Sequence, residues 1–222
     1  MSDLTKTLVI IPARAGSKRI VGKNSKELKG KPLIAYSIEY AQKYIHADII
    51  ISTDDPLIAE ITKSYGVNCL NRTEDLAKDT SPTIDVLKDV LNRQNKTYEN
   101  VVLLQPTNPL RPDNLFGKAW IEYQKSPQDG LLTVSKNDKK LGAISNGKYT
   151  PTSYKFGQRS QDLEDLYYEN GLLYILPTSL ISQGVLMGKN PTALNVDHPF
   201  GSVDIDTELD WLWAELILEK YR

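Results

Sequence analysis

TLVIIPARAGSKRIVGKN, residues 7–24, joins a short apolar run to a loop rich in glycine and basic side chains. The run at 7–11 is typical of a strand buried on both faces, as in parallel sheets. Gly16 and Gly22 allow the backbone that follows to bend and to approach a ligand closely. Residues 33–44 carry apolar side chains on two sides, which predicts a largely buried helix. The order strand, loop, helix indicates the beginning of an α/β fold.

The same alternation continues along the chain. Further strands are predicted at residues 48–52, 67–70, 101–105, 131–135 and 171–176. Further helices are predicted at residues 56–65, 83–92, 114–125 and 207–221. This order predicts a three-layer α/β/α, Rossmann-like fold with a mostly parallel sheet, whose ligands bind at the carboxyl ends of the strands.

The last predicted helix has apolar residues at helical spacing. We expect five of them to face inward: Leu209, Leu212, Trp213, Leu216 and Ile217. Thr207 can cap this helix, with Asp210 at the reciprocal position of a capping box.

One segment, 136–168, interrupts the alternation. It is polar and rich in glycine, serine, asparagine and tyrosine. It is too long and irregular for a simple crossover. We interpret it as an excursion from a single domain, residues 1–222, that carries substrate or dimer contacts.

Composition excludes several classes of protein. The net charge of −1 disfavours a general nucleic-acid binder. No apolar stretch approaches the ~18 residues of a membrane span, and the polar residues 1–6 do not resemble a signal peptide. Cys69, which we expect to be buried, is the only cysteine. A chain that cannot form an intrachain disulfide fits a reducing compartment, so we expect a cytoplasmic location without membrane or nucleic-acid partners.

The loop after the first strand carries a concentration of positive charge. Arg14, Lys18, Arg19 and Lys23 offer cationic donors, and Ser17 and the loop amides can point at phosphate oxygens. The spacing is not that of a P-loop, which disfavours a generic kinase or NTPase. On residue types alone, a polyphosphate site and a solvated basic loop are equally good interpretations.

Two other motifs place polar groups after predicted strands. LLQPTNPLRP, residues 103–112, offers a stiff polar rim suited to a base or a ribose. SVDIDTELDW, residues 202–211, contains Asp204 and Asp206, whose carboxylates share one side of an extended backbone. Such a pair suits Mg²⁺, although helix capping alone would also explain it. In ISTDD, residues 51–55, we favour capping of the next helix over metal binding.

Together these motifs resemble the acylneuraminate cytidylyltransferases, the CMP-sialic acid synthetases. The first loop matches at Pro12, Ala13, Arg14, Gly16, Ser17, Lys18, Arg19, Lys23 and Asn24. Residues 51–55, 79–83, 103–112, 159–163, 167–175 and 202–211 resemble further family elements in the same order. The chain departs from the family at Asn108, where serine is usual.

The resemblance implies roles for individual residues. Nucleotide binding is implied for Arg14, Ser17, Lys18, Lys23, Asn24, Arg72, Gln105 and Thr107. Sugar binding is implied for Gln105, Arg111, Arg159 and Asn170. Asp204 and Asp206 would hold Mg²⁺ or Mn²⁺, and Arg14, Lys23 and Asp206 would act in catalysis. The family also implies a homodimer that packs through the excursion at 136–168.

The implied reaction transfers CMP from CTP to the anomeric hydroxyl of an acidic nine-carbon sugar and releases pyrophosphate. N-acetylneuraminate is the expected sugar, with legionaminate, KDN and pseudaminate as alternatives. Asn170, Gly171 and Leu172 favour sialate or legionaminate over pseudaminate, and the C-terminal pattern disfavours KDO. A non-catalytic nucleotide-binding regulator is the rival from another class, and it would have no need of the two aspartates. A dinucleotide oxidoreductase is disfavoured, since no G-x-G-x-x-G follows the first strand.

Overall fold

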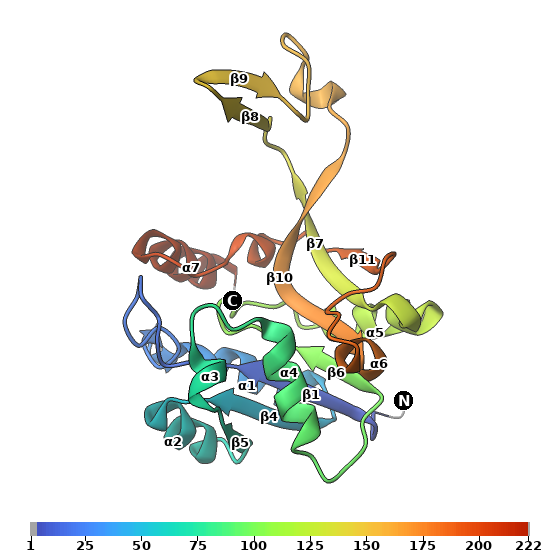
Figure 1. Ribbon diagram of the computed structural model, residues 1–222. Coiled ribbons are helices and arrows are strands. Elements are labelled where there is room, and N and C mark those ends of the chain that lie inside the picture. Colours follow the sequence, from blue (N-terminus) through green and yellow to red (C-terminus); the bar gives the residue numbers. More distant parts are fainter. Residues whose placement is uncertain (1–3, 222) are drawn as a thin grey trace.

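A computed structural model describes residues 4–221, which build one seven-stranded sheet flanked by helices (Figure 1). The strands are β1 (Thr7–Pro12), β4 (Asp48–Thr53), β5 (Asn68–Asn71), β6 (Asn100–Leu103), β7 (Leu131–Asn137), β10 (Leu166–Pro177) and β11 (Thr192–Asn195). Their spatial order is β11-β7-β10-β6-β1-β4-β5. All run in one direction except β10, which is antiparallel to β6 and β7. The prediction of a mostly parallel sheet is confirmed. The expected single domain, 1–222, includes residues 1–3 and 222, which lie outside the described residues.

Strand β1 shows why the molecule has three layers. Its side chains alternate between the two faces of the sheet. Val9 and Ile11 join a core cluster with α1 (Leu33–Tyr44) and α5 (Leu115–Lys125). Leu8 and Ile10 join a second cluster with α4 (Thr83–Asn92) and α6 (Thr178–Ser182). Because both faces of the strand are buried, its sequence is continuously apolar.

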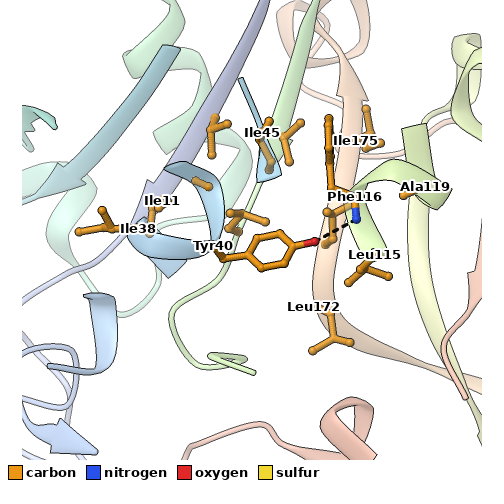
Figure 2. Packing of buried hydrophobic residues seen from close by; sticks show 14 of the residues in the cluster. Ile11, Ile38, Tyr40, Ile45, Leu115, Phe116, Ala119, Leu172 and Ile175 are labelled. Atoms are coloured by element: carbon orange, nitrogen blue, oxygen red, sulfur yellow. Dashed lines mark hydrogen bonds between the residues drawn. The ribbon is translucent and has the colours of Figure 1, made fainter. Parts of the chain in front are cut away.

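Figure 2 shows the first of these clusters, in which Tyr40 joins α1 to α5. The backbone N–H of Phe116 donates a 2.9 Å hydrogen bond to the Tyr40 hydroxyl. Burial raises the pKa of Tyr40 to about 12, so the phenol remains neutral. The bond satisfies one of the backbone donors that a helix leaves unpaired at its first turn.

The shorter elements are β2 (Glu27–Leu28), β3 (Lys31–Pro32), α3 (Glu74–Ala77), η1 (Pro127–Asp129) and η3 (Pro199–Ser202). Helix α2 (Pro56–Ser64) begins as predicted, because the Asp55 carboxylate accepts a 2.9 Å hydrogen bond from the Leu57 N–H. Cys69 is exposed on β5, so the expectation that it is buried was wrong. Strand β5 lies at the sheet edge, where side chains are less covered. Within residues 4–221, none of the helices combines the length and apolar character that a membrane span requires.

Helix α7 (Glu208–Tyr221) has the predicted capping box but a different buried face. Thr207 N–H donates to Asp210 at 2.7 Å, and Asp210 N–H donates to the Thr207 hydroxyl at 3.3 Å. The buried residues are Trp211, Ala214, Ile217 and Leu218. Of the residues expected to face inward, only Ile217 does so, and Leu209, Leu212, Trp213 and Leu216 are exposed. The helix carries two apolar stripes, and its sequence alone does not reveal which of them meets the core.

Residues 138–165, which we call the arm, connect the end of β7 to the start of β10 and stand away from the sheet (Figure 1). The segment is less irregular than predicted. It contains a hairpin of β8 (Gly142–Ser145) and β9 (Lys148–Pro151), followed by η2 (Ser160–Asp162). Asn146 and Gly147 form the turn with φ of 51° and 75°. An Asn-Gly pair between short strands is a strong hairpin signal, which the prediction overlooked.

The pairing of β10 with β7 is interrupted between Glu169 and Tyr174. Gly171 lies in this irregularity with φ of 70°. A Cβ atom there would lie 2.5 Å from the side-chain oxygen of Asn108. Only glycine fits this conformation and this contact together.

We therefore predict that Gly171→Ala lowers the free energy of unfolding by about 1–3 kcal/mol more than Gly147→Ala does. Gly147 has a similar φ, but nothing lies within 4 Å of its added Cβ. The control therefore isolates the cost of the backbone conformation. Urea unfolding measures both variants, and equal losses would contradict the packing argument.

Candidate active site

Two adjoining cavities of about 300 and about 260 Å³ open beyond the carboxyl ends of β1, β5 and β6. Arg14, Ser17, Lys23, Asp79 and Asp206 line both of them, so we treat them as one cleft. This is the sheet edge at which ligands of open α/β folds bind.

All eight residues predicted to bind the nucleotide line this cleft. They are Arg14, Ser17, Lys18, Lys23, Asn24, Arg72, Gln105 and Thr107. They come from three separate parts of the sequence, and the fold brings them to one place.

The loop after β1 is fixed by hydrogen bonds to its neighbours. The Ala15 N–H donates to the Asp54 carboxylate at 2.9 Å, which attaches the loop to the end of β4. The Asn24 amide donates to the Arg14 carbonyl at 3.1 Å. Gly22 turns the chain with φ of 62°. Asn24 therefore shapes the loop as well as lining the cleft.

The cations of the loop already contact a carboxylate. Arg14 and Lys18 both form ion pairs with Asp79. Hydrogen bonds from Lys18 and Arg14 lower the pKa of Asp79. An anion bound in the cleft would take over these two cations. The sequence analysis matched residues 79–83 to a family element and did not identify Asp79 as the counter-ion of Arg14 and Lys18.

Lys23 joins the loop to the C-terminal aspartates. Its side chain is only 10% exposed. Its ammonium donates to the Ile205 carbonyl at 2.6 Å and to the Asp206 carboxylate at 2.9 Å. Arg19 lies 3.6 Å from the same carboxylate. Asp206 thus faces the positive side of the cleft.

Asp204 and Asp206 share one face of an extended segment, as predicted. Val203 and Ile205, which alternate with them along the chain, are buried, while both aspartates face solvent. Desolvation by the surrounding protein and the charge of Asp206 raise the pKa of the Asp204 carboxyl, and a hydrogen bond from Thr107 partly offsets this. Two like charges held together in this way favour a bound cation.

The pair fits a magnesium ion that brings other ligands with it. Among residues 4–221, no three His, Cys, Asp or Glu side chains gather into a metal site. Mg²⁺ typically takes one or two carboxylates and completes its shell with phosphate oxygens and water. The donor set of Asp204 and Asp206 matches this pattern.

Arg72 is buried at the base of the cleft. Its guanidinium donates to the Ser52 carbonyl at 2.9 Å and to the Ser52 hydroxyl at 3.3 Å. Burial lowers the pKa of this guanidinium, although an arginine remains cationic near neutral pH. The contacts fix its position against the end of β4.

Arg111, predicted to bind the sugar, does not line the cleft. Its buried guanidinium donates to the Leu172 carbonyl at 2.5 Å, the Ser37 hydroxyl at 3.0 Å and the Gln105 carbonyl at 2.9 Å. Burial lowers its pKa to about 10. It borders a different cavity of about 580 Å³, between α1 and residues 109–113. In this structure Arg111 holds the backbone of Gln105, and its sugar contact stays a prediction.

Asn170, also predicted to bind the sugar, is buried and hydrogen-bonded within the protein. Its side-chain oxygen accepts from Thr133 at 2.6 Å, and its amide donates to Ser135 at 3.0 Å. The neighbouring Asn108 donates to the carbonyls of Asn170 at 2.9 Å and Val203 at 3.2 Å. This network holds the segment that leads into Asp204, so both residues position the site rather than line it.

Arg159 lies in the arm. It is 70% exposed and pairs with Asp162 at 2.7 Å. Figure 1 shows the arm standing away from the sheet. Arg159 is not among the residues that line the cleft of its own chain.

Comparison with known proteins gives a consistent result. The family described as cytidylyltransferase matches residues 8–182. The chain is 35% identical to a CMP-N,N'-diacetyllegionaminic acid synthase from Legionella pneumophila, with 96% of this chain and 97% of that protein aligned. It is 34% identical to a pseudaminic acid cytidylyltransferase from Campylobacter jejuni, with 96% of each chain aligned. It is 32% identical to an N-acylneuraminate cytidylyltransferase from Streptococcus agalactiae, over 93% of this chain but only 52% of that longer protein.

Solved structures resemble the fold. A CMP-2-keto-3-deoxy-manno-octonic acid synthetase complexed with CTP gives a TM-score of 0.73 at 14% identity, covering 98% of this chain and 100% of the other. A 4-diphosphocytidyl-2C-methyl-D-erythritol synthase from Anaerococcus prevotii gives 0.68 at 16% identity, with the same coverage. The predicted nucleotidyltransferase fold is confirmed.

The raised pKa of Asp204 leads to a prediction about stability. A carboxyl whose pKa is higher in the folded state destabilises that state when ionised. We predict that Asp204→Asn raises the unfolding midpoint at pH 7 without divalent cations. The gain should fade as the pH falls through the raised pKa, and vanish below the ordinary value of 3.8. Thermal unfolding from pH 7 to pH 3.5 measures it.

Asp197→Asn is the matched control, because Asp197 is exposed. It should leave the midpoint nearly unchanged at pH 7. Adding Mg²⁺ should then stabilise the wild type more than Asp204→Asn. A lower midpoint for Asp204→Asn at pH 7 would show that the two carboxylates do not repel each other.

Proposed function

Since this chain belongs to the cytidylyltransferase family, we propose that it transfers CMP from CTP to the anomeric hydroxyl of a sialic-acid-type nonulosonic acid and releases pyrophosphate. The observation that carries the proposal is the cleft itself. The cleft is lined by side chains of the basic loop at 14–24, by Arg72, by residues 105–107 and by Asp206. Cationic donors on one side and carboxylates on the other suit a triphosphate that is bound together with a metal ion.

Protein groups would act mainly by positioning and by neutralising charge. The sugar hydroxyl attacks the α-phosphorus of CTP in line, and pyrophosphate leaves. Arg14 and Lys23 stabilise the negative charge that builds on the leaving group. Arg72, Gln105 and Thr107 border the rest of the cleft, where the cytidine would lie.

Asp204 and Asp206 would hold the Mg²⁺ or Mn²⁺ ion, which when bound polarises the phosphate and favours deprotonation of the hydroxyl. Lys23 would hold Asp206 in place through its 2.9 Å contact. Asp206 is also the candidate to accept the proton of the attacking hydroxyl.

The relatives define the class of sugar but not its member. The identities to the legionaminate, pseudaminate and neuraminate enzymes are 35%, 34% and 32%. N-acetylneuraminate remains the first candidate, with legionaminate, KDN and pseudaminate as alternatives. All of them carry a carboxylate beside the reacting carbon.

The test is pyrophosphate release with CTP, Mg²⁺ and a panel of these four sugars. We expect turnover with at least one of them, and a specificity constant at least about tenfold higher for one than for the others. Asp206→Asn is the control for turnover by a contaminating enzyme. Nucleotide binding without turnover on any sugar would instead favour a regulatory nucleotide-binding protein.

Arg159 does not line the cleft of its own chain, although the family resemblance implies that it binds the sugar. We propose that the enzyme is a two-fold homodimer in which Arg159 of each arm holds the sugar carboxylate in the cleft of the other subunit. The guanidinium fork suits bidentate contact with a carboxylate. The exposure of Arg159 and the projection of the arm support this arrangement.

Mixed dimers test the proposal. An Arg159→Ala subunit keeps its own cleft, and an Asp206→Asn subunit keeps its arm. We predict that each variant alone is nearly inactive, whereas co-expression restores about a quarter of wild-type activity, since half the dimers contain one complete site. No recovery in purified mixed dimers would mean that Arg159 does not act across the interface.

A further inference from the structure

Asp79 and Asp206 both line the cleft among its basic side chains. The proposed metal ion gives Asp206 a purpose there. It gives none to Asp79, which places a second negative charge on the wall of a cleft that is proposed to bind a triphosphate. A carboxylate in that position repels the phosphates and needs an explanation of its own.

Asp79 lies on the turn at 78–82, between α3 and α4. One of its carboxylate oxygens pairs with Arg14 and the other with Lys18. A phosphate group would use its oxygens in the same way, since charge-assisted hydrogen bonds from arginine and lysine are its usual partners. Asp79 therefore engages the donors that a phosphate in this cleft requires.

These two contacts can be exchanged at little cost to the fold. The Lys18 side chain is 80% exposed, and exposed ion pairs contribute little to stability. The turn also has hydrogen bonds of its own. The Ser81 N–H donates to the Lys78 carbonyl at 3.1 Å, and the Ser81 hydroxyl donates to the Asp75 carbonyl at 2.8 Å. The turn therefore does not depend on Asp79 for its shape.

Arg14 requires an anion beside it, because a second guanidinium is close. Burial lowers the pKa of Arg72, and the positive charge of Arg14 lowers it further. A negative charge next to Arg14 relieves this repulsion. Asp79 supplies that charge from within the protein, whereas a bound phosphate supplies it from the ligand, so the two compete for the same guanidinium.

We propose that Asp79 is an internal competitor of pyrophosphate. By pairing with Arg14 and Lys18, it weakens the hold of the cleft on the leaving group and favours its release after CMP transfer. The inference rests on the proposed function and adds a residue that controls how long the product stays.

The competition affects the product more than the substrate. CTP has further anchors, because its cytidine would lie near Arg72, Gln105 and Thr107. Once the bond to the α-phosphorus is broken, pyrophosphate is no longer tied to those anchors and depends on the basic loop and the metal ion. Product release limits turnover in many enzymes, so a device that loosens this one product raises the rate without loosening the nucleoside.

Calorimetric titration of the whole chain in Mg²⁺ tests the proposal, with pyrophosphate, CTP and CMP as separate ligands. Asp79→Asn keeps the shape of the side chain and removes its charge. We expect the dissociation constants of pyrophosphate and CTP to fall about three- to tenfold, because two exposed ion pairs no longer oppose binding. The dissociation constant of CMP should stay nearly unchanged, since CMP lacks the phosphates that meet Arg14 and Lys18.

Two further variants separate local competition from a general effect of charge. Asp85→Asn removes one negative charge six residues further along the chain, from an exposed residue that does not line the cleft. It should leave all three dissociation constants nearly unchanged. Asp79→Glu retains the charge and should bind pyrophosphate about as weakly as the wild type does.

Several results would overturn the inference. Weaker binding of pyrophosphate to Asp79→Asn would mean that Asp79 supports the site, and unchanged binding would mean that it does not compete. An equal gain in Asp85→Asn would show only a general effect of charge. Each of these outcomes leaves the proposed reaction standing, because turnover of CTP is measured on the wild type. A wild type that binds neither pyrophosphate nor CTP would instead contradict the proposed function, and the inference with it.

Discussion

The site depends on one buried ammonium group. Lys23 is almost inaccessible to solvent, so its charge requires partners within the protein. It finds them at the Ile205 carbonyl and the Asp206 carboxylate, 182 and 183 residues further along the chain. Since separating the two segments would leave this buried ammonium without either partner, the basic loop and the acidic segment are held together as the two walls of one cleft. Ile20 of the basic loop and Ile205 also pack in one hydrophobic cluster with α7, which holds the loop and the acidic segment together.

Local sequence patterns predicted most of the fold because its strands and helices are strongly periodic. The bounds of α1 and α4 agree with the prediction, and β1 reads as a doubly buried strand because both of its faces pack against helices. Helix α7 was harder to predict. It has two apolar stripes, and a periodic pattern identifies a helix without identifying which side meets the core. The antiparallel direction of β10 could not be predicted either, since the residue pattern of a buried strand does not depend on the direction of its neighbours.

The candidate site divides in a similar way. Motif residues after β1 and β6 were predicted to bind the nucleotide, and they line one cleft, because a strand end fixes where the next few residues lie. Arg111 and Asn170 do not line the cleft, and this could not be predicted, since whether a polar side chain faces a cleft or a backbone carbonyl depends on partners far away in the sequence. Asn108 illustrates the point. Its amide bridges the carbonyls of Asn170 and Val203, and Gly171 is needed to make room for it.

The central claim is that the triphosphate and its metal ion lie between the basic loop and the aspartate pair. The most direct measurement is a crystal structure with CTP and Mn²⁺, in which anomalous scattering locates the metal ion. The account predicts a manganese peak within coordination distance of Asp204 or Asp206, with phosphate oxygens contacting Arg14 and Lys23. Nucleotide bound instead in the cavity between α1 and residues 109–113, or manganese away from both aspartates, would contradict it.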